Sequence, residues 1–451
     1  MAWVIVLLLL LRSPGAAYAE LLRRADAQAE VLERSEAETL YRRATLLAPG
    51  RTVAYERLSR LYLDWGRSPA ALSALDRATN LAPDDPSLSQ LVLDVHAARG
   101  DWPAVAEVAH RLLESLPEDR ETYHALASAQ LQMLDWAAAL STYEKILSLW
   151  PMDSKAHERV GIFLAGGEGG AVEHLLAAET ELSRRLLDEL IDTALVGDVS
   201  YTHARVGRLL SRRQAWALAA YHFSSALEQA PDYADAHVYL GQALDRLGHA
   251  EEAIVHLRRG VELAPDSPVA HTVLGMHYER LGDLTAAREA YGQAYDLDPE
   301  NPGTCVAIGQ TWAAEGRYIA AEIWLTEAVT LAPEDPQLWA VLSRFYLTYH
   351  ITAEGKAVTA TENYLELAPD AATAHDLRGW AAIQSGNYQV ARQHLEEALD
   401  IDPTLAEAYY HLGVLHRAQG RMVEARAAFE RATDLDASGR LAPLIERAMQ
   451  S

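Results

Sequence analysis

Several arginines recur at a fixed interval in the middle of the chain. Arg212, Arg246 and Arg280 are separated by 34 residues each. A guanidinium group is a permanent cation with a planar fork of N–H donors, so a row of them suits carboxylates or phosphates. The candidate binding residues are Arg205, Arg208, Arg212, Arg246, Arg280 and Arg344, with the aromatic residues Tyr201, Tyr239, Trp380 and Tyr410.

Two interpretations of this set stay open. The arginines could bind an acidic peptide or an anionic glycan, or they could pair with Asp245, Glu279 and neighbouring acids of the same chain. The aromatic residues could likewise contact a partner or pack between helices.

Other residue types that carry chemistry form no catalytic or metal-binding pattern. The 17 histidines include no His-Glu-x-x-His motif, and a single cysteine, Cys305, excludes an internal disulfide and a zinc site built on several cysteines. We expect Cys305 to be a small buried residue. The glycine stretch at 166 to 170 lacks the Lys-Ser/Thr ending of a phosphate loop, so a linker is expected there. We predict no catalytic residue, no metal, no cofactor and no enzyme activity.

The charge balance argues against nucleic acid as a partner. The 451 residues include 39 Lys plus Arg and 64 Asp plus Glu, which gives a formal net charge of −25. A nucleic-acid binder needs a basic face that displaces counterions from the phosphates. A row of arginines would be a local exception on an acidic protein.

Prolines mark a repeat that covers almost the whole chain. In two stretches of the chain, prolines recur every 34 residues. The first stretch has Pro49, Pro83, Pro117 and Pro151, and the second has Pro231, Pro265, Pro299 and Pro333. Twelve units run from 18 to 439, and the exceptions to the 34-residue length are 154 to 199, with 46 residues, and 336 to 371, with 36. Small residues at three positions of most units, and larger apolar residues at i, i+3, i+4 and i+7, predict two closely packed amphipathic helices.

Turn and cap residues agree with this division. Seven units have glycine at position 15, where the first helix must stop and reverse. We expect N-caps at Asp85, Ser267, Asn301 and Asp335, each followed by a proline at the first helical position. The fourth position carries His157, His203, His237, His271 and His375, which we expect to fill packing space between helices.

The unit resembles the tetratricopeptide repeat. Its pattern of Leu-Gly, aromatic, Ala, aromatic, Ala and Pro is found in His-Thr-Val-Leu-Gly-Met-His-Tyr at 271 to 278, followed by Ala287, Tyr291, Ala294 and Pro299. The resemblance implies an all-α, right-handed superhelical solenoid of antiparallel helix hairpins. It also implies a concave groove, lined by the first helices, that binds peptides or partner proteins and that the arginines would face. The lysines and asparagines of a chaperone-tail clamp are missing from this face.

We divide the chain into five parts on this basis. Residues 1 to 19 form a signal peptide or membrane anchor, 20 to 153 a first array of about four units, and 154 to 199 an enlarged irregular hairpin. Residues 200 to 439 form a second array of seven units, and 440 to 451 a helix that caps the end of the array.

The amino-terminal residues suggest where in the cell the protein is located. Residues 2 to 11 are apolar and too few to span a bilayer alone, and Ala17-Tyr18-Ala19 resembles a signal-peptidase site. A cleaved leader, an uncleaved membrane anchor that begins upstream of Met1, and a tail without targeting meaning are the three interpretations. The first two predict an extracytoplasmic or membrane-anchored protein and make a cytoplasmic location less expected.

Two functions follow from the sequence. The first is a noncatalytic scaffold, exported or membrane-associated, that binds a partner protein or peptide in its groove. The alternative is the soluble regulatory or substrate-capturing part of a membrane-bound enzyme system, such as surface-polysaccharide assembly.

Overall fold

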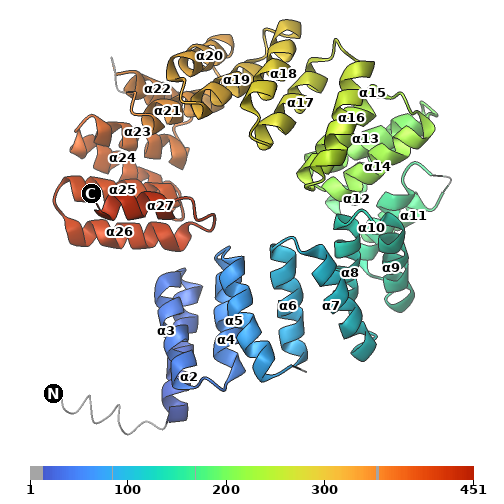
Figure 1. Ribbon diagram of the computed structural model, residues 1–451, viewed down its shortest axis with the longest axis horizontal. Helices are drawn as coiled ribbons and strands as arrows, with labels where there is room; N and C mark the ends of the chain where they lie inside the picture. Colours follow the sequence, from blue (N-terminus) through green and yellow to red (C-terminus); the bar gives the residue numbers. More distant parts are fainter. Residues whose placement is uncertain (1–13, 84, 168, 352–354, 451) are drawn as a thin grey trace. The chain divides into compact units, whose positions relative to one another are not determined.

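The computed structural model describes residues 14–83, 85–167, 169–351 and 355–450, which form 26 α-helices and no strand. Consecutive helices pair along the chain (Figure 1). The prediction of an all-α array of helix pairs is confirmed. The predicted leader or anchor at residues 2 to 11 lies outside the described residues.

The chain divides into two compact units. Unit 1 takes in residues 1–101 and 333–451, and unit 2 residues 102–332. The helices of unit 1 are α2 (Pro14–Glu30), α3 (Arg34–Leu47), α4 (Thr52–Asp64), α5 (Ser68–Leu81), α6 (Pro86–Ala98), α21 (Pro336–Thr348), α22 (Lys356–Leu367), α23 (Ala372–Gln384), α24 (Tyr388–Ile401), α25 (Ala406–Ala418), α26 (Met422–Leu435) and α27 (Ala442–Gln450). Those of unit 2 are α7 (Trp102–Ser115), α8 (Arg120–Gln132), α9 (Trp136–Leu149), α10 (Ser154–Leu164), α11 (Ala171–Ala178), α12 (Glu181–Ala194), α13 (Val199–Arg212), α14 (Trp216–Gln229), α15 (Ala234–Arg246), α16 (Ala250–Leu263), α17 (Pro268–Arg280), α18 (Leu284–Leu297), α19 (Pro302–Ala314) and α20 (Tyr318–Leu331).

The starts of the first helices follow the predicted caps. The side chains of Ser267, Asn301 and Asp335 accept hydrogen bonds from backbone N–H groups of the first turn at 2.8 to 3.3 Å. Each cap is followed by a proline, whose missing N–H would have had no partner there.

The turn inside each hairpin uses left-handed backbone. Glycines at position 15 have φ between +70° and +89°, and they are Gly66, Gly100, Gly248, Gly282, Gly316, Gly386 and Gly420. Four other units place Leu32, Leu134, Gln214 and His350 there, with φ between +53° and +60°. The turn therefore imposes the conformation even where a side chain makes it costly.

Close helix approach explains the glycines at position 8. A β-carbon on Gly275 would lie 2.5 Å from Cδ1 of Tyr291, and one on Gly241 would lie 2.6 Å from Cγ of Leu257. The second helix of each pair thus packs its large side chain directly against the backbone of the first.

The 154 to 199 segment contains three helices, one more than a hairpin. Gly170 precedes α11, and Glu179 ends it with φ of +56°. Thr180 then starts α12 through a capping box with Ser183. Leu175 and Leu186 are fully buried in the same core as the neighbouring repeats, so the segment is part of the packed array.

The fourth-position histidines pack between helices as predicted, and they do so in a specific way. Four of them face a histidine of a following helix through their Nδ1 atoms, in the pairs His157–His174, His203–His222, His237–His256 and His375–His394, at 2.9 to 3.2 Å. The centroids of the paired rings lie 5.1 to 5.3 Å apart. The paired Nδ1 atoms are therefore at the distance of an N–H···N hydrogen bond.

A carbonyl fixes the tautomer within these pairs. In three pairs Nε2 of the fourth-position residue lies 2.9 to 3.0 Å from the carbonyl oxygen of a proline six residues earlier, and in the other Nε2 of His222 lies 3.0 Å from Ile162 O. That nitrogen must donate its proton, so the Nδ1 of the same ring accepts one from the facing histidine. His271 makes the same bond to Pro265 and has no facing histidine, because position 23 of its unit is Ala290.

The two sequence segments of unit 1 contact each other. The indole Nε1–H of Trp65 donates to Thr433 O at 3.1 Å, and the backbone N–H of Ser35 donates to the Asp434 carboxylate at 2.9 Å. Burial raises the pKa of Asp434. These bonds join α3 and α4 to α26.

Helix α2 begins before the predicted start of the first array at residue 20. Tyr18 is 4% exposed, and its hydroxyl accepts a hydrogen bond from the backbone N–H of Ala54 at 3.1 Å. The possible cleavage point after Ala19 therefore falls inside a helix whose first turns belong to the packed hairpin.

Candidate functional site

The candidate site lies on three first helices of unit 2. Helices α13, α15 and α17 come from consecutive repeats and contact one another in order. Because each carries arginine at the same position of its unit, the repeat brings Arg212, Arg246 and Arg280 to the same end of neighbouring helices. We call the surface made by α13, α15 and α17 the arginine face.

Two arginines of the arginine face are neutralised within the chain. Nε of Arg205 lies 2.6 Å from the carboxylate of Glu189, and its Nη1 donates to the Tyr201 hydroxyl at 2.9 Å. Arg280 donates from Nε to Asp245 at 2.7 Å and from Nη2 to the same carboxylate. The hydrogen bond to Tyr201 raises the pKa of Arg205, and the one to Asp245 raises the pKa of Arg280.

The other three arginines keep their charge available. Arg208, Arg212 and Arg246 are exposed and form no ion pair within the described ranges. The guanidinium carbon of Arg208 lies 5.4 Å from the ring centre of Tyr239, and that of Arg246 lies 5.6 Å from Trp216. An aromatic face holds a guanidinium group in place and leaves its N–H donors free for an anion.

A hollow of about 410 Å³ opens beside Arg246 and Arg280, between α15, α16 and α17. Its polar lining includes Arg246, Arg280, Gln242 and Glu279, and Met276 and Leu257 supply apolar surface. Glu279 accepts a hydrogen bond from the Tyr291 hydroxyl at 2.7 Å. The hollow therefore offers a ligand the free guanidinium group of Arg246, the amide of Gln242 and the unbranched side chain of Met276, beside the carboxylates of Asp245 and Glu279.

Asp245 connects the site to the core. Its carboxylate lies 2.6 Å from Nδ1 of the buried His277 and also binds Arg280. Both partners come from the next repeat, so Asp245 joins α15 to α17. Because the Asp245 carboxylate already binds Arg280, an acidic ligand would have to compete with it for that guanidinium group.

Three predicted site residues belong to unit 1. Arg344 is exposed on α21 and forms no ion pair with the acids that the structure describes. Trp380 stacks on His411 with 4.5 Å between ring centroids, and Tyr410 packs against Phe429 at 5.9 Å. Burial raises the pKa of Tyr410. Trp380 and Tyr410 thus take part in helix packing.

Sequence reasoning missed two contributors to the arginine face. Met276 lies on the first helix of its unit, four residues before Arg280, so helix periodicity could have placed it on the same face. Trp216 starts a second helix, and no sequence signal indicated that it would lie beside Arg246.

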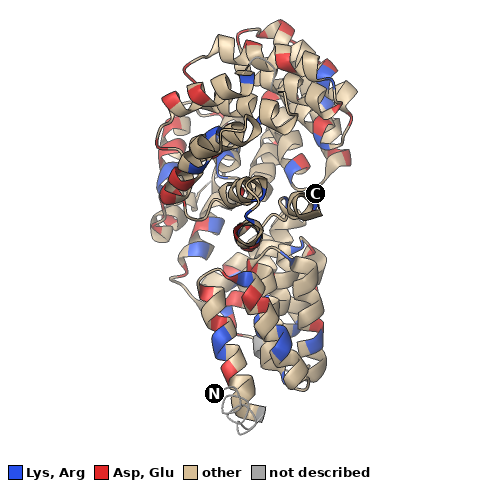
Figure 2. Cartoon of the chain, turned by 90° about the vertical axis from the view of Figure 1, so that its left-hand side faces the viewer, with Lys and Arg blue, Asp and Glu red and all other residues tan. Residues whose placement is uncertain are grey.

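Cys305 is the one cysteine of the sequence. Cys305 is buried and unpaired, as expected, and burial raises its pKa to about 11. No group of three or more His, Cys, Asp or Glu side chains suited to a metal ion occurs among the described residues. Within those residues, no helix combines the length and apolar character needed to cross a bilayer. Acidic and basic residues are both spread over the helices (Figure 2).

Comparisons with known proteins agree on the kind of repeat. Tetratricopeptide repeat models match residues 212–276 and 280–345, and a second such model matches 355–406 and 378–440. Protein NPG1 of Arabidopsis thaliana is 45% identical over 49 residues, which are 11% of this chain and 7% of that protein.

Two solved structures are similar over long stretches. Yeast Tom70 matches at 15% identity with a TM-score of 0.43, covering 97% of this chain and 96% of that one. A tetratricopeptide repeat protein of Parabacteroides merdae matches at 13% identity with a TM-score of 0.45, covering 56% of this chain and 99% of that one.

Proposed function

Because the chain is a tetratricopeptide repeat protein, we propose that it is a noncatalytic scaffold that binds an acidic segment of a partner protein on its arginine face. The observation that carries this proposal is the trio Arg208, Arg212 and Arg246, which are exposed and unpaired within the described ranges. Proteins of this family typically bind protein or peptide partners, and exposed guanidinium groups favour an acidic one.

The charges favour a carboxylate-rich ligand. The chain as a whole repels acidic molecules, because its formal net charge is −25. An acidic segment would therefore be attracted only where cations are concentrated, and the three free guanidinium groups can each take a carboxylate in a bidentate contact. The hollow beside Arg246 adds apolar contact through Met276.

We further propose that the scaffold is held at a membrane by residues 2 to 11. The buried position of Tyr18 supports an uncleaved anchor over a leader cut after Ala19, because cleavage would remove Tyr18 from the core of the first hairpin. Deleting a buried tyrosine of this kind costs about 3 to 5 kcal/mol by analogy with other large aromatic residues.

Site-specific photo-crosslinking tests the location of the partner. A benzophenone amino acid replaces Met276 in the hollow or, as control, Ile323 on α20, which is 65% exposed. We expect a crosslinked peptide rich in Asp and Glu from position 276, and its loss when Arg208→Glu and Arg246→Glu are added. Equal capture from both positions, or captured peptides without acidic residues, would contradict the proposal.

A further inference from the structure

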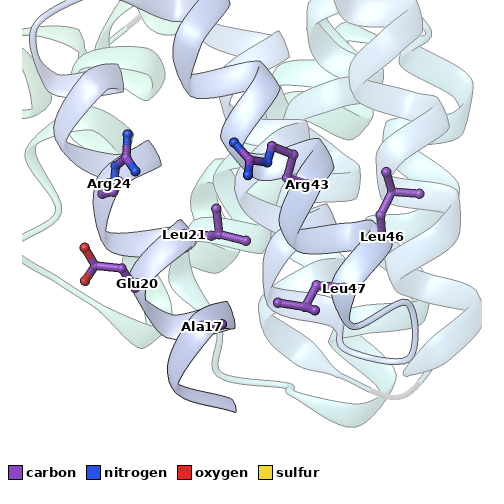
Figure 3. A pocket seen from close by; sticks show the side chains of 7 residues that line it. All are labelled: Ala17, Glu20, Leu21, Arg24, Arg43, Leu46 and Leu47. Atoms are coloured by element: carbon purple, nitrogen blue, oxygen red, sulfur yellow. The ribbon is translucent and has the colours of Figure 1, made fainter. Parts of the chain in front are cut away.

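One end of the first hairpin exposes apolar side chains. Helices α2 and α3 are antiparallel, so the first turns of α2 lie beside the last turn of α3. A hollow of about 570 Å³ lies between them and is lined by Ala17, Leu21, Leu46 and Leu47, together with three charged residues. Leu21 and Leu47 point toward each other from the two helices (Figure 3). Leu46 is 81% exposed, an arrangement that a leucine adopts at a cost in water.

The charged residues of this hollow are mainly basic. Arg24 and Arg43 line it from opposite helices. Arg43 makes no ion pair among the described residues, and Arg24 has a distant one to Glu36 at 3.9 Å. The third charged residue, Glu20, points away from the hollow (Figure 3) and pairs with Arg23 at 2.8 Å. The hollow therefore combines leucine surface with two cations.

The apolar run of the sequence joins the chain at this same end. Residues 2 to 11 are separated from α2 by only Arg12 and Ser13, and Ala17 in the hollow lies in the first turn of that helix. Ten apolar residues are fewer than the roughly 20 that a helix needs to cross the hydrocarbon core of a bilayer.

We propose that this end of the first hairpin is a lipid-contact surface that docks on an anionic bilayer. Leu46 and Leu47 enter the interface, and Arg24 and Arg43 bind lipid phosphates. The proposal rests on the anchoring role of residues 2 to 11 given above. A single short apolar anchor holds a protein only marginally and reversibly, so a second, electrostatic contact is what stabilises attachment.

Charge distinguishes a bilayer from the other occupants of this hollow. If residues 2 to 11 folded back onto it, the adjoining Arg12 would approach Arg24 and Arg43, and like charges would repel. An apolar peptide would leave Arg43 without an anion and Arg24 with only its distant pair to Glu36. Lipid phosphates satisfy the arginines while the acyl region receives the leucines.

Vesicle co-sedimentation of the full chain tests the proposal. We expect tighter binding to phosphatidylcholine vesicles that contain phosphatidylglycerol than to phosphatidylcholine alone. Arg24→Gln with Arg43→Gln should weaken binding to the anionic vesicles by about fivefold per arginine and leave binding to neutral ones unchanged. The matched control is Arg77→Gln with Arg99→Gln, two exposed arginines elsewhere in unit 1, which should have no such effect.

The leucines are tested in the same assay. Leu46→Ser with Leu47→Ser should weaken binding to both kinds of vesicle, whereas the control Ile319→Ser with Ile323→Ser, on exposed positions of α20, should not. Hydrogen exchange provides a readout on the unaltered protein. We expect slower exchange in the segment around Leu46 and Leu47 when anionic vesicles are added.

The outcomes separate this inference from the anchoring proposal. Wild-type binding that ignores lipid charge and is unaltered by Arg24→Gln with Arg43→Gln overturns the lipid-contact surface and leaves the anchor standing. If the protein binds neither the neutral nor the anionic vesicles, both the lipid-contact surface and the anchor are overturned. Protection of Leu46 and Leu47 without vesicles would show that the chain itself covers the hollow, and it also overturns the inference.

Discussion

Acid should loosen the packing of α13 on α14 through the pair His203–His222. Nδ1 of His222 faces Nδ1 of His203 at 2.9 Å, and its Nε2–H donates to Ile162 O at 3.0 Å. A proton added to His222 would set two N–H groups against each other. Burial, with the charge of His203 as a smaller cause, lowers the pKa of His222 to about 3.

The direction and magnitude of this pH effect on stability follow from the difference in proton binding between the folded and unfolded chain. An unfolded histidine has a pKa of about 6.5, so below that pH the unfolded chain binds a proton that the folded chain excludes. The stability from this group is fully present above about pH 6.5 and falls as the pH is lowered, by about 1.4 kcal/mol per pH unit. At pH 5 the loss is about 2 kcal/mol.

Hydrogen exchange of α14 measures the free energy of local opening, which suits a repeat array that can unfold in parts. Between about pH 7.5 and pH 5, we expect this free energy to fall by about 2 kcal/mol more in the wild type than in His222→Phe. The control is His271→Phe, which removes a fourth-position histidine without a facing partner. The same pH dependence in wild type and His222→Phe would refute the reasoning, whatever the absolute stability of the variant.

Two pairs of substitutions, each measured by urea unfolding, test where the repeat requires close helix packing or a left-handed backbone. Gly275→Ala should lower the free energy of unfolding by about 1 to 3 kcal/mol, because the added carbon lies 2.5 Å from Tyr291, whereas Gly292→Ala, with no atom within 4 Å, should raise it by up to about 1 kcal/mol. A loss at both positions would contradict the packing argument. Gln214→Gly should raise the free energy of unfolding by up to about 1 kcal/mol by relieving φ of +59°, and Gly248→Ala, at φ of +89°, should lower it by a similar amount. Destabilisation by Gln214→Gly would show that contacts of the Gln214 side chain stabilise the fold by more than its left-handed backbone destabilises it.

Local rules predicted most of the fold. Proline and glycine spacing located the helices, and the caps at Ser267, Asn301 and Asp335 depend on bonds within three residues. The left-handed turns at Leu134 and Gln214 were not predictable from residue type, because the packing of the hairpin imposes them.

For the arginine face, the sequence predicted where the arginines lie but not which of them pair with acids. Helix periodicity placed the arginines, but their neutralisation depends on contacts between repeats. Glu189 reaches Arg205 from the enlarged segment, and Asp245 reaches Arg280 from the preceding repeat. Such pairings are set by how successive hairpins stack, which the sequence of a single unit does not specify.

Binding of an acidic peptide tests the central claim most directly. Fluorescence anisotropy of a labelled glutamate-rich peptide is followed with the wild type, Arg208→Glu with Arg246→Glu, and the control Arg77→Glu with Arg99→Glu. We predict that reversal on the arginine face weakens binding by at least about tenfold, the value of one charge-assisted hydrogen bond, and that the control does not. Equal affinity of all three proteins would contradict the account.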